Sequence, residues 1–424
     1  MTIATFDSLK TYCEQVARRA KVASMALLDI PTDKKNDWLE SCAEALIARS
    51  NEILKANAND LRNSELLGLT PAEIDRLTLT ASRISAMASG LQKVATLPDP
   101  IGECIEKTIG SHGIAISKVR VPLGVIFFIY ESRPNVTIDA AAICVKSGNA
   151  VVLRGGKEAS QSSQVLVEIL REQCEPYGIP ADAVQLIETS DREVIDHLLK
   201  MPSYIDLVIP RGGKGLIKRV SEQAQMPVLK HYDGNCHVYV DRDADLEMAV
   251  EIIVNSKCQR MGVCNACESL LVHRDIASRL FDSLVPRLQT YAVEIRGDKF
   301  VCDLIPMAVP ASEEDWSQEY LGPVLSVKVV ESVDEAIVHI NQYGSHHTDA
   351  IVTSIEATAE KFLRLVDSSA VMWNASTRFN DGGEFGMGAE IGISTDKFHA
   401  RGPCGLQELT TYKYLVRGSG QVRS

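Results

Sequence analysis

One stretch of the chain, 256–269, holds the residues best suited to covalent chemistry. It lies between a helix-like apolar run at 246–254 and a short β-like run at 270–273, so it is expected to form a loop. Gly262 stands two residues before Cys264, where glycine lets the backbone turn tightly beside a ligand. A thiolate near backbone N–H groups can attack a carbonyl carbon. Cys264 is therefore a candidate nucleophile, although a lone cysteine is more often a small buried hydrophobe.

Two glycine-rich turns carry basic residues and are candidates for phosphate binding. Each follows an apolar run and opens a helical pattern, the usual setting of a phosphate site in a parallel sheet. Neither has the GxGxxG spacing, and a solvated turn is the alternative for each. Basic residues in the first turn favour a 2′-phosphate, and hence NADP. The predicted cofactor residues are Arg154, Gly155, Gly156 and Lys157 in the first turn, and Arg211, Gly212 and Gly213 in the second.

Two other groups of residues resemble metal or redox motifs. Cys264 and Cys267 form a CxxC, but the chain has no second one, and Cys267 is expected to be a core residue. His346, His347 and Asp349 lack the spacing of a helical metal site and are expected to be polar loop residues. No metal site is predicted.

Composition excludes several classes of protein. The chain has 424 residues, 24% of them charged, and a formal net charge of −12, which argues against nucleic acid as the main partner. It shows neither the pattern of a signal peptide nor an apolar run near the roughly 20 residues of a membrane span. The 11 cysteines are odd in number and scattered, as in reduced cytoplasmic proteins.

The elements expected to position these residues fall into two α/β halves. Residues 5–97 read as helical, with Thr70, Pro71 and Glu73 at a helix start, and 106–109 and 115–119 read as a hairpin. Apolar strand patterns then alternate with helices, which is typical of parallel sheets covered on both faces. The expected strands are 124–130, 150–154, 183–188, 205–209, 228–229 and 236–240, then 270–273, 324–330, 350–352, 370–373 and 409–417. The expected helices include 160–172, 215–225, 276–291, 333–341 and 357–365.

With these pieces in order, the chain resembles the aldehyde dehydrogenase superfamily over most of its length. Four landmarks occur in the order found in that family. They are Pro122-Leu-Gly-Val125, Ser147-Gly-Asn-Ala-Val-Val-Leu153, Gly262-Val-Cys264 and Glu319-Tyr-Leu-Gly-Pro-Val324.

The closer resemblance is to the family of γ-glutamyl phosphate reductases, also called glutamate-5-semialdehyde dehydrogenases. Its hallmarks here are Tyr130-Glu-Ser-Arg-Pro-Asn-Val-Thr137, Gly262-Val-Cys-Asn-Ala266, the run 330–351, Asn374-Ala-Ser-Thr-Arg-Phe379, Gly382-Gly-Glu-Phe-Gly386, Gly388-Ala-Glu-Ile-Gly-Ile-Ser394 and His399-Ala-Arg-Gly-Pro403. One departure from the wider superfamily fits this chemistry. Hydrolytic members use a glutamate to activate water, and His231 stands in its place in His231-Tyr-Asp-Gly234. An enzyme that works through an acyl phosphate should not hydrolyse its thioester, so the loss of that base is expected.

The resemblance implies NADPH-dependent reduction of L-glutamyl 5-phosphate to glutamate 5-semialdehyde and phosphate, in proline biosynthesis. Cys264 would form the thioester, with its backbone N–H and Asn135 as oxyanion donors. Asn135 could instead cap a helix. Glu319 would hold the nicotinamide ribose, and Arg378 and His347 would bind substrate anions. Arg378 could equally form an ordinary salt bridge.

The resemblance also implies an aldehyde dehydrogenase-like fold with two doubly wound α/β domains and a small β oligomerisation flap. The NADP-binding domain would combine 1–103, 120–251 and 386–405, and 252–385 would form the catalytic domain. The flap, 104–119 and 406–424, would build a dimer or tetramer. Glutamate 5-kinase is a possible partner. The alternatives are another enzyme of the superfamily acting on a different acyl phosphate or aldehyde, a non-catalytic nucleotide-binding module, and a zinc or disulfide protein built on the CxxC.

Overall fold

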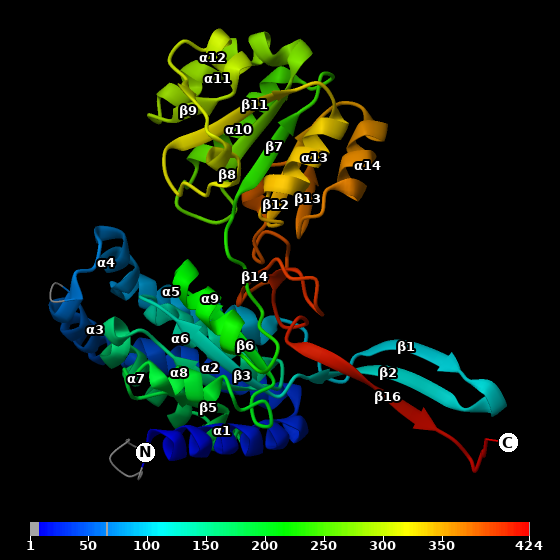
Figure 1. Cartoon of the computed structure of the whole chain (residues 1–424). Coiled ribbons are helices and arrows are strands. Elements are labelled where there is room, and N and C mark those ends of the chain that lie inside the picture. Colours follow the sequence, from blue (N-terminus) through cyan, green and yellow to red (C-terminus); the bar gives the residue numbers. More distant parts are fainter. Residues whose placement is uncertain (1–7, 65–66, 424) are drawn as a thin grey trace. The chain divides into compact units, whose positions relative to one another are not determined.

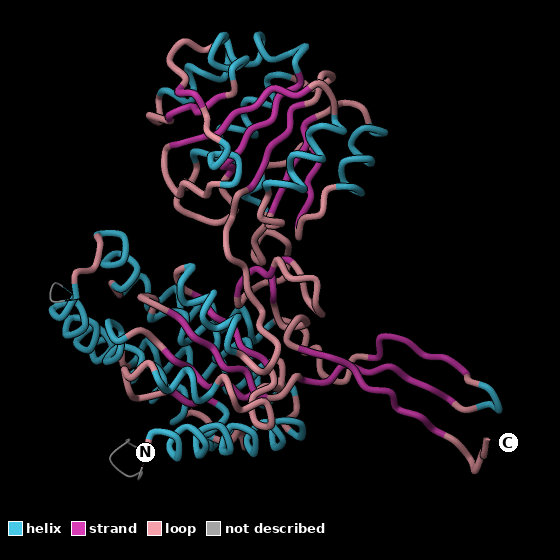
Figure 2. Tube along the Cα trace, viewed as in Figure 1, coloured by secondary structure: helices cyan, strands magenta, loops and turns pink. Residues whose placement is uncertain are grey.

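The computed structural model describes residues 8–64 and 67–423 of the chain. They form two compact units, drawn in Figures 1 and 2. The first unit comprises 1–230, 386–392 and 404–424, and the second comprises 231–385 and 393–403. No helix in the described ranges is long and apolar enough to cross a membrane.

The first unit begins with a set of helices. They are α1 (Leu9–Ala26), α2 (Thr32–Ala48), α3 (Ser50–Ser64), α4 (Pro71–Leu77) and α5 (Ala81–Thr96). The predicted helix start at Thr70 is confirmed, because Thr70 and Glu73 form a reciprocal capping box with Pro71 in the first turn. Trp38 and Leu39 of α2 are fully buried, so this helical region packs into the core of the unit.

A four-stranded parallel sheet carries the two glycine-rich turns. Its order is β5-β4-β3-β6, from β3 (Val125–Tyr130), β4 (Ala150–Arg154), β5 (Val184–Leu186) and β6 (Leu207–Arg211). The intervening helices are α6 (Pro134–Lys146), α7 (Ser160–Glu172), α8 (Glu193–Leu198) and α9 (Lys214–Gln223). Every residue of β3 and β4 is buried, which explains why neither strand alternates apolar and polar residues.

Two expected strands of this sheet are different in the structure. The expected strand at 228–229 is only an isolated bridge between Val208 and Val228. Residues 236–240 do form β7 (Cys236–Val240), but β7 pairs with β8 and β12 of the second unit. A buried apolar strand pattern shows that a strand is covered on both faces, but it does not show which sheet the strand joins.

The hairpin and the tail form a separate three-stranded antiparallel sheet. Its order is β1-β2-β16, from β1 (Cys104–Ile109), β2 (Ala115–Pro122) and β16 (Thr410–Arg417). The hairpin predicted from the pattern around Ser111 and Gly113 is therefore confirmed, and Figure 1 shows its two strands beside β16. Ile109, Tyr414 and Val416 are all more than half exposed, which is unusual for large apolar residues on a sheet.

The second unit is built on a seven-stranded parallel sheet (Figure 1). Its order is β10-β9-β11-β8-β7-β12-β13. The strands not yet given are β8 (Cys267–His273), β9 (Glu294–Gly297), β10 (Val309–Pro310), β11 (Val324–Val330), β12 (Thr348–Val352) and β13 (Ala370–Trp373). The helices are α10 (Leu246–Cys258), α11 (Ala277–Gln289), α12 (Lys299–Leu304), α13 (Val333–Tyr343) and α14 (Glu356–Leu365).

The boundary between the two halves lies earlier than the sequence suggested. The expected boundary was 251/252, whereas the structure divides the chain at 230/231. The reason is that β7 lies between β8 and β12 inside the second sheet, and α10 packs into the same core. The chain later passes between the units along the short strands β14 (Gly392–Ser394) and β15 (Gly402–Cys404).

Candidate active site

Cys264 lies in the turn between α10 and β8, as predicted. Its side chain is partly exposed, and a backbone hydrogen bond of 3.1 Å from Ala266 to Val263 closes the turn around it. By contrast, Cys267 is fully buried at the start of β8, and burial raises the pKa of its thiol to about 12. The expectation that Cys267 is a core residue is therefore confirmed, and only Cys264 of this pair is accessible.

The segment just before β7 packs directly against the backbone of Cys264. A Cβ added to Gly234 would lie 1.8 Å from the carbonyl oxygen of Cys264, so only glycine fits there. Two residues later, the thiol of Cys236 donates a hydrogen bond of 3.2 Å to the same oxygen. The carbonyl oxygen of Cys264 is thus held in place by the close approach of Gly234 and by the hydrogen bond from the buried thiol of Cys236.

Two histidines lie beside the Cys264 thiol. A ligand atom of His231, a ligand atom of His347 and the sulfur of Cys264 all lie within 4.8 Å of one another. The two imidazole rings meet edge to face, with their centroids 5.5 Å apart. His347 was predicted as a site residue, and the structure brings it to the cysteine. His231 was noted only as the residue in place of a catalytic glutamate, and its contact with the site was missed.

Arg378 approaches the same site from the turn after β13. Burial lowers the pKa of its guanidinium, and the neighbouring Arg260 lowers it further, while Cys264 and Asp381 oppose that shift. Its Nε donates a hydrogen bond of 2.7 Å to Gln259, which leaves the far side of the guanidinium for an anion. The loop that carries Arg378 is attached to the cysteine loop, because Asn265 donates to the carbonyl oxygen of Asn380 at 3.1 Å.

A buried ion pair closes the cysteine loop at its base. Lys257, near the end of α10, pairs with Glu268 in β8, and both side chains are fully buried. Glu268 also accepts a hydrogen bond of 3.1 Å from the backbone of Leu321. Burial raises the pKa of Glu268 to about 7, even though Lys257 acts in the opposite direction. The ion pair therefore joins the two elements from which the loop emerges.

Glu319, predicted to hold a ribose, has a different contact in the structure. Its carboxylate accepts a hydrogen bond of 2.8 Å from the backbone N–H of Gly234. Because Gly234 lies against Cys264, Glu319 supports the segment that faces this cysteine. Its role toward the cofactor stays a prediction.

The glycine-rich turns follow β4 and β6, on either side of β3. Gly155 lies against the ring of Tyr130, and a Cβ at Gly156 would collide with the carboxylate of Glu158. At the second turn, Glu131 accepts a hydrogen bond of 3.0 Å from the backbone N–H of Gly213. Both turns are thus folded against side chains from their own unit.

The residues of these turns fit the phosphates of a dinucleotide. A Cβ added at Gly213 or Gly215 would meet no atom within 4 Å, so the start of α9 is open. Such a helix start attracts anions. Lys157 is exposed in the other turn. Arg154, also predicted there, is nearly buried and donates to the carbonyl oxygens of Gly155 and Ser190 at 3.0 and 3.1 Å.

Asn135 is the second residue of α6, and Arg133 occupies the capping position. The amide of Asn135 donates a hydrogen bond of 3.1 Å to Asp139, one turn along the helix. The alternative that Asn135 caps the helix is therefore wrong. Burial raises the pKa of Asp139 to about 6, while the Asn135 hydrogen bond and the charge of Arg211 lower it.

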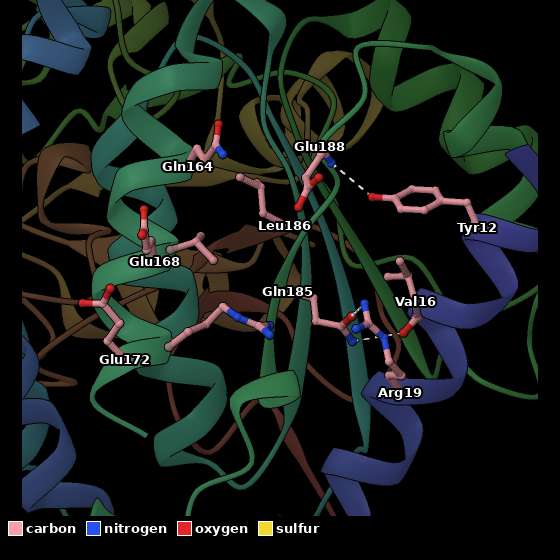
Figure 3. A pocket seen from close by; sticks show the side chains of 11 residues that line it. Tyr12, Val16, Arg19, Gln164, Glu168, Glu172, Gln185, Leu186 and Glu188 are labelled. Atoms are coloured by element: carbon pink, nitrogen blue, oxygen red, sulfur yellow. Dashed lines mark hydrogen bonds between the residues drawn. The ribbon is translucent and has the colours of Figure 1, made fainter. Parts of the chain in front are cut away.

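A pocket of about 450 Å³ lies elsewhere in the first unit, between α1, α7 and the edge strand β5. Figure 3 shows Tyr12 and Arg19 on one wall and Gln164, Glu168 and Glu172 on the other. None of the residues predicted to carry chemistry lines this pocket. Size alone therefore does not identify the candidate active site, which is defined by the side chains around Cys264.

Comparison with known proteins places these observations in a family. The model of the aldehyde dehydrogenase family matches residues 2–307 and 298–413. A gamma-glutamyl phosphate reductase of Rhodopirellula baltica is 59% identical over 98% of this chain and 96% of its own length. One from Caldanaerobacter subterraneus is 52% identical over 97% of this chain and 99% of its own length.

Solved structures give the same result for the fold. The gamma-glutamyl phosphate reductase of Thermotoga maritima superposes with a TM-score of 0.95 at 45% identity, covering 97% of this chain and all of that one. An acetylating aldehyde dehydrogenase from Geobacillus thermoglucosidasius has a TM-score of 0.68 at 17% identity and covers 98% of both chains. The second likeness shows the fold alone, and it confirms the predicted aldehyde dehydrogenase-like architecture.

Proposed function

Because the chain belongs to the aldehyde dehydrogenase family and, within it, to the gamma-glutamyl phosphate reductases, we propose that it reduces L-glutamyl 5-phosphate to L-glutamate 5-semialdehyde. Phosphate is the second product, and the reaction serves proline biosynthesis. The observation that carries the proposal is the partly exposed Cys264 beside His231, His347 and Arg378. A nucleophile flanked by cationic or polar side chains suits an anionic acyl phosphate.

In the first step, the Cys264 thiolate attacks the acyl carbon. A sulfur–carbon bond forms, the bond between the acyl carbon and the phosphate oxygen breaks, and phosphate leaves with that electron pair. Arg378 and His347, which are near Cys264, would hold the substrate's anionic groups during this transfer. A thioester on Cys264 remains.

The second step reduces that thioester. A bound nicotinamide cofactor supplies the hydride. The resulting tetrahedral oxyanion collapses, expels the Cys264 thiolate and releases the aldehyde. The thioester must survive until the hydride arrives, and His231 in place of the hydrolytic glutamate removes the carboxylate base that would activate water.

Both steps place negative charge on the acyl oxygen, so donors must face it. We assign this role to the backbone N–H of Cys264 and to the amide of Asn135. The Asn135 amide must then give up or share its bond to Asp139, which makes Asn135→Ala a direct test of the assignment. A fall in kcat of about 10²–10³-fold is the effect of losing one such donor.

We propose NADPH as the reductant. The basic turn with Arg154 and Lys157 would bind the 2′-phosphate, and the turn with Arg211, Gly212 and Gly213, which is open at Gly213, would bind the pyrophosphate. The two basic residues differ in their availability to a ligand. Lys157 is exposed, whereas the guanidinium of Arg154 already donates to two carbonyl oxygens. Lys157 is therefore the main candidate for NADP selectivity, and Glu319 for the nicotinamide ribose.

The sheet β1-β2-β16 supports the further proposal of a homodimer or homotetramer. Its exposed apolar side chains would be covered by a second copy. A labile acyl phosphate also favours, but does not require, a complex with the glutamate 5-kinase that makes it. We place the enzyme in the cytoplasm, where its 11 thiols stay reduced.

The test runs the reaction backwards, with glutamate 5-semialdehyde and phosphate, and follows the absorbance of the reduced nicotinamide. Wild type and Cys264→Ala are compared with NADP and with NAD. Phosphate-dependent reduction of NADP that vanishes in Cys264→Ala supports acyl-phosphate chemistry through the cysteine. Turnover without phosphate would indicate a hydrolytic aldehyde dehydrogenase, and turnover in Cys264→Ala would remove the thioester step.

A further inference from the structure

We infer that His231, His347 and Cys264 form a reversible Zn²⁺ site in which the metal masks the nucleophile. The inference concerns the donor set alone and does not depend on which substrate the enzyme reduces. It starts from three ligand atoms, two imidazole nitrogens and one sulfur, within 4.8 Å of one another. Imidazole and thiolate together are the preferred ligands of zinc.

The distances are close to those of a bound metal. Bonds of about 2.3 Å to sulfur and about 2.0–2.1 Å to nitrogen place tetrahedral ligand atoms roughly 3.3–3.7 Å apart. The cluster must therefore contract by no more than about 1–1.5 Å, starting from the observed limit of 4.8 Å. His231 and Cys264 are partly exposed and lie outside helices and strands, so side-chain rotation can supply this movement.

Both histidines are already oriented through their second ring nitrogen. Nδ1 of His231 lies 3.0 Å from the carbonyl oxygen of Ile393, where it donates, so Nε2 carries the lone pair. Nδ1 of His347 lies 2.8 Å from the hydroxyl of Thr348, which in turn accepts from Asn380 at 2.6 Å. Such outer hydrogen bonds hold the rings of metal-binding histidines in place.

The protein supplies three ligands and leaves the fourth position open. The nearby Cys236 is not counted as a fourth ligand, because its thiol donates a hydrogen bond to the carbonyl oxygen of Cys264. A site with three protein ligands and an open position keeps water or a small anion on the metal. Zinc binding releases the Cys264 proton to solvent and ties up the sulfur lone pair that would attack substrate.

The first experiment uses the wild-type chain and Zn²⁺ alone. The protein is alkylated with iodoacetamide with and without one equivalent of Zn²⁺, and each cysteine is quantified by mass spectrometry. We expect protection of Cys264 only. Cys104 is exposed, and Cys258 and Cys302 are partly exposed, so they serve as internal controls that keep reacting. Equal protection of these thiols, or no protection of Cys264, would overturn the inference.

The second experiment replaces zinc with Co²⁺ and records the near-ultraviolet charge-transfer band of a cobalt–thiolate bond. The band should appear on titration of the wild type and be absent in Cys264→Ser. His231→Asn and His347→Asn should bind Co²⁺ far more weakly. His346→Asn is the matched control, because the ring of His346 faces the carbonyl oxygen of Asp367 and does not belong to the cluster.

A third variant tests the outer hydrogen bond without touching a ligand. Thr348→Val keeps the shape of the side chain but removes the hydroxyl beside His347. Loss of such a partner lowers metal affinity by about 10–100-fold. Cobalt affinity that is the same in Thr348→Val, His347→Asn and wild type would refute the assignment of His347. If a variant fails to fold, the alkylation result on the wild-type chain still decides whether Cys264 binds the metal.

Discussion

The cysteine loop and the glycine-rich turns differ in how tightly their backbones are packed. Around Cys264 the backbone is locked by a close approach from Gly234, a thiol donor from Cys236 and the buried pair of Lys257 and Glu268. Around the turns, Gly213 leaves the start of α9 open, and the carboxylates of Glu131 and Glu158 accept hydrogen bonds from the backbone N–H groups of Gly213 and Ser132. Covalent chemistry needs a nucleophile held within a fraction of an ångström, whereas a dinucleotide needs room and exposed donors.

The largest effect is expected at the ion pair that closes the cysteine loop. Lys257→Met leaves the carboxylate of Glu268 buried and without its cation, and breaking such a pair costs about 3–5 kcal/mol. Urea unfolding of the wild type and of Lys257→Met measures the loss in free energy of unfolding. The control is Arg287→Met, which breaks a solvent-exposed pair with Glu251, and such surface pairs contribute little to stability. Equal losses in the two variants would show that the pair does not anchor the loop.

The next effect is expected at Gly234. In Gly234→Ala the new Cβ would lie 1.8 Å from the carbonyl oxygen of Cys264, so Cys264 must move. A displacement of about 1 Å costs about 10²-fold in kcat/KM. The control is Gly90→Ala inside α5, where a Cβ meets no atom within 4 Å and alanine suits the helix. An equal fall in kcat/KM in the two variants would contradict the idea that the close approach of Gly234 holds Cys264 in place.

A smaller effect is expected for cofactor choice. Lys157→Ala removes the exposed cation proposed to face the 2′-phosphate. A hydrogen bond to a charged group contributes about 1.5–3 kcal/mol, so the KM for NADPH should rise by about 10–100-fold while that for NADH changes little. Steady-state kinetics with both cofactors measure the ratio. Lys218→Ala on the exposed side of α9 is the control, and a similar rise there would indicate a general charge effect.

The smallest effect is a dependence of stability on pH at Asp139. Its folded pKa of about 6 lies above the ordinary value of 3.8, because of burial, so the folded chain holds a proton that the unfolded chain loses. This contribution is complete below about pH 4 and disappears as the pH rises through about 6. Asp139→Asn should flatten the profile between pH 4 and 6, and Asp37→Asn on the exposed side of α2 should not.

Local patterns were sufficient to predict most elements and the loop that holds Cys264. Apolar runs placed β4 and β13 to the residue, and Gly262 marked the turn before β8. The same patterns assigned β7 to the wrong sheet, since a strand buried on both faces looks alike in either half of the molecule. The sheet that a strand joins is decided by its pairing with strands far away in the sequence. A short segment of sequence does not contain that information.

The missed contacts are also long-range. His231 reaches Cys264 only because the segment before β7 and the turn before β8 lie side by side, as the pairing of the two strands requires. The presence of His231 in place of a glutamate indicated that this position differs from hydrolytic aldehyde dehydrogenases. It did not indicate how close His231 lies to Cys264. Lys257 and Glu268 could have been paired from their positions on either side of the loop, had helix and strand ends been known.

The division of the chain at 230/231, 385/386, 392/393 and 403/404 also sets the order in which its parts can be completed during synthesis. Most of the second unit is one continuous stretch and can close its sheet while the ribosome is still adding residues. The first unit must wait for the tail, because β16 is the partner of β2, and Leu409 accepts a hydrogen bond of 2.9 Å from Asn149. A chain that stops before the tail would expose the unpaired edge of β2, which could then pair with strands of other chains and aggregate. Pairing with β16 covers this edge.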